Sequence, residues 1–267
     1  MARNDIFTTM SGEINAGEAK EPVPDEVFRG EHLAPWQDVL QARRSIRVYD
    51  EEPIPEERMR TCLREAMLAP SSSNLQPWEM YWARTREKKK AVAKACMGQP
   101  AASTAGELVV VVARYDKWNH NRKRLLELMS DGGKTELPPS VATYYKKLMP
   151  LMMRNDPLGV MNLVRRIGFT VAGLRGPIVR QPVNDGDHRI WAHTQAALAA
   201  QTLMLSLTAH GYDSCPMGGI DSKRLARILN LPSGAEVAMV ISAGRRKPEG
   251  LYGPRVRLPV EEMIHEC

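Results

Sequence analysis

Residues 69–78 gather more hydrogen-bonding side chains than a connection between two elements needs. A helix pattern ends at this stretch and a strand pattern begins after it, while two prolines restrict the backbone between them. A stiff loop with many donors and acceptors suits a planar heteroaromatic ligand, although an ordinary turn could have the same composition. The polar and restricting residues are Pro70, Ser71, Ser72, Ser73, Asn74, Gln76 and Pro77.

Two basic clusters lie near opposite ends of the sequence. The early cluster places three arginines and a hydroxyl within five positions, and forked guanidinium groups suit the oxygens of a phosphate. In the late cluster, two arginines project to the same side if residues 254–259 are extended. A surface charge cluster and an unpaired basic tail are the plain alternatives. The residues are Arg43, Arg44, Ser45, Arg47, Arg255 and Arg257.

A fourth cluster, Pro216, Met217, Gly218 and Gly219, follows a long apolar helix pattern. Paired glycines let a backbone amide approach a ligand closely because no Cβ is in the way. A simple turn is an equally good interpretation of this segment.

Other site classes have little support in the sequence. The six histidines stand apart, and the four cysteines form no CxxC pair, so neither a metal site nor a disulfide framework is expected. A phosphate-binding P-loop and the GxGxxG dinucleotide fingerprint are both missing. The cysteine usage fits a reducing, cytoplasmic compartment.

Composition limits the partners of the chain. The 267 residues are 43% hydrophobic, which allows one large domain with a sizeable core. A formal net charge of +6 permits an anionic partner, but aromatic residues make up only 6% of the chain. Because no basic stretch alternates with aromatic residues, nucleic-acid binding is not expected. No run of about eighteen apolar residues indicates a membrane span, so we expect no membrane partner.

The hydrophobic pattern predicts alternating helices and strands after a polar N-terminal extension over residues 1–34. Strands are expected at 78–83, 108–113 and 237–243, and the unbroken β-branched run at 108–113 should be central and covered on both faces. Between them, residues 117–187 form a Met-rich, mostly helical excursion interrupted by prolines.

A long helix should follow this excursion. We expect Asp185 or Asp187 to cap it and Gly211 to occupy its C′ position. Because it is apolar almost all round, it should be the buried core helix of the domain, which we place at residues 35–267.

The four polar clusters occur in an order that resembles the nitroreductase family of flavin enzymes, over roughly residues 38–265. The resemblance implies an α+β fold with a central mixed, mainly antiparallel β-sheet flanked by helices. It also implies an intertwined homodimer that binds FMN at the subunit interface and uses NAD(P)H.

The resemblance gives each cluster a role toward FMN. Arg43, Arg255 and Arg257 would meet the phosphate, while Arg44 and Ser45 would meet the flavin edge or the ribityl chain. Arg47 would lie beside N1 and the C2 oxygen, where positive charge stabilises the anionic reduced flavin.

The two uncharged clusters are implied to contact the flavin as well. The segment of Pro216, Met217, Gly218 and Gly219 would pack beside the isoalloxazine, with a backbone amide on N5. Some members of the family have a glutamate where this chain has Gly218. The loop residues would reach the FMN of the neighbouring subunit. They are Pro70, Ser71, Ser72, Asn74 and Gln76.

The implied reaction is transfer of a hydride from NAD(P)H to flavin N5, followed by reduction of a small acceptor such as a nitroaromatic or a quinone. No catalytic side chain is expected because the flavin carries the chemistry. Residues 117–187 would form a wall of the substrate pocket. Two alternatives remain: another flavin reaction, such as reductive dehalogenation, flavin fragmentation or heterocycle oxidation, and a non-catalytic basic binding module.

Overall fold

The computed structural model of the chain describes residues 32–50, 52–154, 160–174 and 176–267. The extension expected over residues 1–34 lies almost wholly outside these residues. Its last two positions belong to the first described helix, α2 (Leu33–Ala42).

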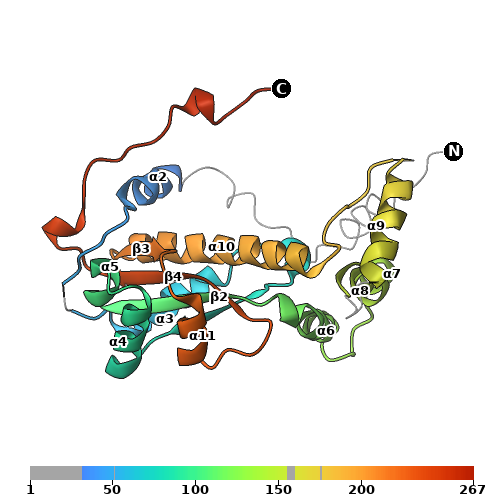
Figure 1. Cartoon of the computed structure of the whole chain (residues 1–267), viewed down its shortest axis with the longest axis horizontal. Coiled ribbons are helices and arrows are strands. Elements are labelled where there is room, and N and C mark those ends of the chain that lie inside the picture. Colours follow the sequence, from blue (N-terminus) through green and yellow to red (C-terminus); the bar gives the residue numbers. More distant parts are fainter. Residues whose placement is uncertain (1–31, 51, 155–159, 175) are drawn as a thin grey trace.

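The core of the fold is a four-stranded antiparallel sheet in the order β1-β2-β4-β3 (Figure 1). The expected central strand is confirmed, since β2 lies between β1 and β4 and all seven of its residues are buried. The expected parallel component is limited, among the described residues, to an isolated bridge between Ser45 and Ser214. The strands are β1 (Trp78–Trp82), β2 (Glu107–Ala113), β3 (Asp213–Met217) and β4 (Glu236–Gly244).

Alternate residues of β2 point into two separate hydrophobic clusters, because side chains alternate between the faces of a sheet. Val109 and Val111 contribute to a cluster formed with α3 (Glu56–Ala66) and α10 (Asp185–Ala209). Val110 and Val112 contribute to a cluster on the other face with α4 (Arg86–Ala95), α5 (Pro100–Ser103) and α11 (Ser222–Ile228). Figure 1 shows α10 and α4 on opposite sides of the sheet.

The long helix α10 only partly meets its expectation. It ends as predicted, with Gly211 at a positive φ of 81° after the helix. Its N-cap is Asn184 rather than Asp185 or Asp187, since the Asn184 side chain accepts a hydrogen bond from the Asp187 backbone amide at 3.0 Å. As expected, it contributes to the core, where Ala196 and Leu203 are buried, but it is not buried all round, because Ile190 is 66% exposed and Leu198 is 43% exposed.

The sequence does not predict strand β3, because residues 216–219 indicated either a turn or a glycine segment open to a ligand. Among the named strands it pairs only with β4 and forms one edge of the sheet, with the isolated bridge from Ser45 to Ser214 on its other side. Pro216 is exposed within it, and an edge strand tolerates a residue that cannot donate a ladder hydrogen bond. Pro216 and Met217 therefore end a strand, and Gly218 and Gly219 follow it.

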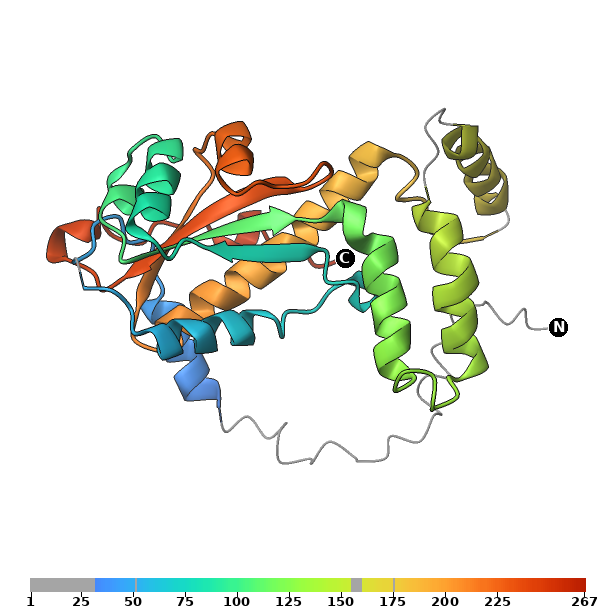
Figure 2. The same ribbon diagram turned by 90° about the horizontal axis from the view of Figure 1, so that it is seen from below.

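The expected excursion is mostly helical and projects from one end of the sheet (Figure 2). Met149 and Met153 are buried within it and pack with Leu75, which belongs to residues 69–78, the segment that we call the serine-rich loop. No helix among the described residues is long and apolar enough to cross a membrane. The short helix η3 (Tyr115–Lys117) leads into the excursion, which contains α6 (Trp118–Met129), α7 (Pro139–Thr143), the π-helix η4 (Tyr144–Leu148), α8 (Met149–Met153) and α9 (Val160–Gly173).

The C-terminal segment returns to the early arginine cluster after β4. Residues 248–250 form the short helix η5 (Pro248–Gly250), and the Arg47 backbone amide donates to the Gly250 carbonyl at 2.9 Å. The tail then runs exposed to Cys267 through η6 (Val260–Glu262). Close backbone contact at Gly250 is thus what brings the two ends together.

We predict that Gly250→Ala destabilises the protein. A Cβ at this position would lie 2.3 Å from the Val48 carbonyl oxygen and 2.9 Å from Cγ2 of Ile46. Overpacking against backbone typically costs about 1–3 kcal/mol, which urea denaturation would measure as a lower midpoint. Gly253→Ala is the matched control, because its Cβ would meet nothing within 4 Å. Equal midpoints for the two variants would contradict the prediction.

Candidate functional site

The two basic clusters, distant in sequence, line one cavity of about 340 Å³. The early segment is held against β3, where the Ile46 amide donates to the Ser214 carbonyl at 3.2 Å. The late segment follows η5 and covers the other side of the cavity. We call this cavity the arginine cradle; its basic residues are Arg43, Arg44, Arg47, Arg255 and Arg257, and Ser45 also lines it.

Two arginines tie the walls of the arginine cradle together through backbone carbonyls. Arg255 Nη2 donates to the carbonyls of Gln41 at 2.7 Å and Arg43 at 3.0 Å. In the opposite direction, Arg44 Nη2 donates to the Gly253 carbonyl at 2.6 Å. Because these acceptors are uncharged, the bonds position the guanidinium groups without neutralising them.

The positive charges of the arginine cradle repel one another. Burial lowers the pKa of Arg43, and the positive charges of Arg255, Arg257 and Arg44 lower it further. Arg47 lies with its guanidinium carbon 5.1 Å from the ring centre of Tyr252, a cation–π contact that holds it at the cavity. An anion bound among these groups would relieve the repulsion.

The glycine cluster lies beside the arginine cradle. The bridge between Ser45 and Ser214 places the early segment beside β3, at a position two residues before Pro216. Gly218 and Gly219 are exposed, and a Cβ on either would meet nothing within 4 Å. The backbone after β3 is therefore open to a flat ligand, whereas Met217 is buried in the core.

The serine-rich loop lies at the other end of the sheet. The loop leads directly into Trp78, which pairs with Ala113 at the end of β2. The arginine cradle lies beside Ser214, which pairs with Ala243. Ala243 pairs in turn with Glu107 at the start of β2. Six residue steps of about 3.3 Å separate the two ends by roughly 20 Å. Three of the four clusters thus come together in one chain, and the serine-rich loop does not join them.

The backbone of the serine-rich loop is unusual. Ser73, Asn74 and Gln76 all have positive φ, between 46° and 54°, although none is glycine. Left-handed conformations of non-glycine residues cost of order 1–3 kcal/mol each, least for asparagine, and persist only where neighbouring contacts hold them. Within the loop, the backbone amide of Gln76 donates to Ser71 Oγ at 2.9 Å.

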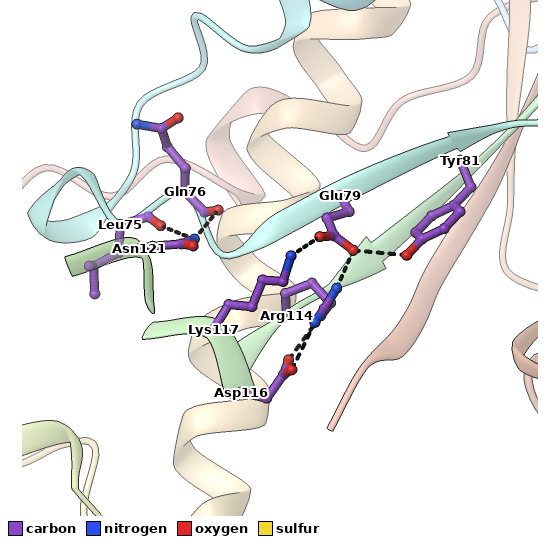
Figure 3. Close-up of polar contacts among 8 residues, drawn as sticks. All are labelled: Leu75, Gln76, Glu79, Tyr81, Arg114, Asp116, Lys117 and Asn121. Carbon is purple, nitrogen blue, oxygen red and sulfur yellow. Dashed lines mark hydrogen bonds and ion pairs between the residues drawn. The ribbon is translucent and has the colours of Figure 1, made fainter. Parts of the chain in front are cut away.

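The helical excursion supplies further contacts that hold this backbone. Asn121 Nδ2 on α6 donates to the Leu75 carbonyl at 2.9 Å and to the Gln76 carbonyl at 3.3 Å (Figure 3). Tyr145 Oη donates to the Ser73 carbonyl at 2.9 Å. Sequence reasoning missed Asn121 because nothing nearby in the chain reveals its distant acceptors.

A compact ion network fixes the start of the excursion to the sheet (Figure 3). Arg114, which is 5% exposed, pairs with Glu79 and forms two hydrogen bonds with Asp116 at 2.9 and 3.0 Å. Lys117 also pairs with Glu79. Burial opposes ionisation of Glu79, but hydrogen bonds from Lys117, Tyr81 and Arg114 outweigh it and lower the pKa of the carboxyl. The carboxylate is therefore charged at neutral pH, and the network anchors α6 beside the loop.

We predict that Asn121→Ala loosens the serine-rich loop without unfolding the sheet. The net value of a hydrogen bond is about 0.5–1.5 kcal/mol, so amide hydrogen exchange in residues 71–77 should accelerate about tenfold. Exchange in β2 should stay unchanged. His120→Ala is the control, since His120 is the exposed neighbour on the same helix. Equal exchange in both variants would show that Asn121 does not hold the loop.

Comparison with known proteins places the whole arrangement in one family. A family model described as the nitroreductase family matches residues 40–245, which include three of the four clusters. A protein of Thermus thermophilus named NADH dehydrogenase is 28% identical over 222 residues, covering 83% of this chain and 91% of that protein.

Solved structures share the fold. A nitroreductase-like protein from Streptococcus mutans aligns with a TM-score of 0.67 at 21% identity, covering 88% of this chain and 99% of that chain. A structure from Exiguobacterium sibiricum, solved in complex with FMN, aligns with a TM-score of 0.60 at 24% identity, covering 87% of this chain and 97% of that chain. The chain therefore belongs to the nitroreductase family, a family of FMN-dependent oxidoreductases.

Proposed function

We propose that this oxidoreductase binds FMN with its phosphate in the arginine cradle and uses NAD(P)H to reduce a small acceptor such as a nitroaromatic or a quinone. The observation that carries the proposal is the convergence of five arginines on one cavity of about 340 Å³. A phosphate would relieve the repulsion that contributes to lowering the pKa of Arg43, so the residues fit the group. The bound flavin would accept a hydride at N5 and pass reducing equivalents to the acceptor.

The arginines would divide the work between the phosphate and the ring. Arg43, Arg255 and Arg257 would surround the phosphate, and bonds to backbone carbonyls already orient Arg255. Arg44 and Ser45 would meet the flavin edge or the ribityl chain. Arg47, held over Tyr252, would place positive charge at the N1 side of the ring and favour its anionic reduced form.

The segment after β3 would cover the edge of the isoalloxazine. Gly218 and Gly219 leave open space where a side chain would otherwise stand, so their backbone amides can approach N5. Neither residue supplies an acid. Nicotinamide and acceptor would therefore be oriented by shape and by backbone groups, and the helical excursion would form a wall of their pocket.

We further propose that two copies of the chain complete each site. The serine-rich loop lies roughly 20 Å of strand from the arginine cradle of its own chain, which supports a second copy as the source of the loop that touches the same FMN. Several helices and the tail present uncovered apolar side chains that such a partner would bury. They include Trp36, Leu40, Ile190, Leu198, Val256, Leu258, Met263 and Ile264.

Combining Arg43→Ala with Arg257→Ala should abolish tight FMN binding while the protein stays folded. Hydrogen bonds to charged groups are worth about 1.5–3 kcal/mol each, so FMN affinity should fall roughly a hundredfold or more. Quenching of FMN fluorescence measures the affinity, and anaerobic NAD(P)H oxidation with a nitroaromatic measures turnover. The control pair is Arg124→Ala with Arg227→Ala, two exposed arginines outside the cavity. Unchanged affinity would place the phosphate elsewhere, and a wild-type protein that binds no FMN would overturn the function.

A mixing experiment tests the shared site. We expect the cradle variant above and a loop variant, Ser72→Ala with Asn74→Ala, each to lose activity alone. If loop and cradle come from different subunits, random mixing restores about a quarter of the wild-type sites, because each heterodimer has one intact pair. If one chain supplies both parts, co-expression restores nothing.

A further inference from the structure

A second large cavity, which we call the α4 groove, lies on the face of the sheet covered by α4, α5 and α11. Its volume is about 940 Å³, and it shares no lining residue with the arginine cradle. Six of its fourteen lining residues are basic and none is acidic. The basic residues are Arg84, Arg86, Lys89, Lys90, Lys94 and Arg224.

Three of these cations have a partner already. Lys89 pairs with Glu107 at 3.1 Å, Arg84 pairs with Glu56, and Arg224 lies 3.5 Å from Asp221. Glu56, Glu107 and Asp221 are thus already engaged. Among the described residues, no carboxylate forms an ion pair with Arg86, Lys90 or Lys94.

The three unpaired cations are arranged in a row. Arg86, Lys90 and Lys94 follow one another at intervals of four residues, so they project from the same face of α4. Like charges at this spacing destabilise a helix by about 0.2–0.5 kcal/mol per pair. On a convex surface such side chains spread into solvent, but these three border one concavity and can meet a single anion.

The lining of the α4 groove is not entirely charged. It contains small residues from three segments, among them Ala93 on α4, Ala102 on α5, and Gly106 just before β2. No aromatic side chain lines the groove, so stacking on a base cannot contribute to recognition there.

We propose that the α4 groove binds a small molecule that carries two or more phosphate groups. Its volume falls in the range of small-molecule pockets, about 300–1,000 Å³. A row of unpaired cations matches linked phosphates better than a single one, because each phosphate can meet its own ammonium or guanidinium group. A lining without aromatic residues disfavours a nucleic-acid strand, which would need stacking as well as charge.

The test uses the FMN-saturated protein, so that the arginine cradle is occupied and cannot bind the probe. Inorganic tripolyphosphate is titrated by calorimetry, with orthophosphate and adenosine as comparison ligands. We expect tripolyphosphate to bind, orthophosphate to bind at least about tenfold more weakly, and adenosine not to bind. Retention of the flavin absorbance shows that the proposed flavin site is intact, whatever the outcome at the groove.

Two exposed lysines provide the decisive variant. Lys90→Gln with Lys94→Gln should weaken tripolyphosphate binding about tenfold or more, with FMN affinity unchanged. Lys146→Gln with Lys147→Gln, an equally exposed pair on η4, is the control for net charge. The proposal is overturned if both variants weaken binding equally, if neither does, or if the wild type binds no tripolyphosphate. It is also overturned if a single-stranded oligonucleotide binds more tightly than tripolyphosphate with the same dependence on Lys90 and Lys94.

Discussion

The pairing of β2 with β1 on one side and β4 on the other is the constraint from which the arrangement of the polar groups follows. Both faces of β2 are buried by apolar clusters, and its pairing with β1 is regular, whereas its pairing with β4 shifts register between Val111 and Val112. The serine-rich loop enters at one end of this sheet, and the arginine cradle forms at the other. A rigid strand therefore separates two regions whose composition suits the same ligand.

The arginine cradle shows how a folded chain can hold like charges together. Its walls are joined by backbone hydrogen bonds, by guanidinium bonds to carbonyl oxygens and by the close approach at Gly250. None of these contacts cancels a positive charge. The fold thus keeps the positive charges around Arg43 close together despite their repulsion, and a bound anion would reduce that repulsion. The α4 groove also gathers positive charge, with three arginines and three lysines, but carboxylates pair with three of these six groups.

The serine-rich loop depends on the helical excursion in a comparable way. The positive φ angles of three non-glycine residues raise the conformational free energy of the loop, and hydrogen bonds from Asn121 and Tyr145 offset this cost. The excursion is in turn anchored by the ion network around Glu79 and Arg114 (Figure 3). A segment that would border a substrate is therefore mechanically connected to the loop proposed to border the flavin.

The sequence by itself determined the elements whose signal is local. The run of valines predicted β2 because β-branched side chains suit a buried strand, and Gly211 marked the end of α10 because it can adopt positive φ. The order of the four polar clusters identified the family. Tertiary structure decided the features that depend on distant neighbours. One is β3, because a pentapeptide that contains proline does not reveal its pairing with β4, and another is the exposed side of α10. Tertiary structure also brought Arg43 to Arg255 and Asn121 to the loop, since contacts across 212 and 46 positions leave no periodic trace in the sequence.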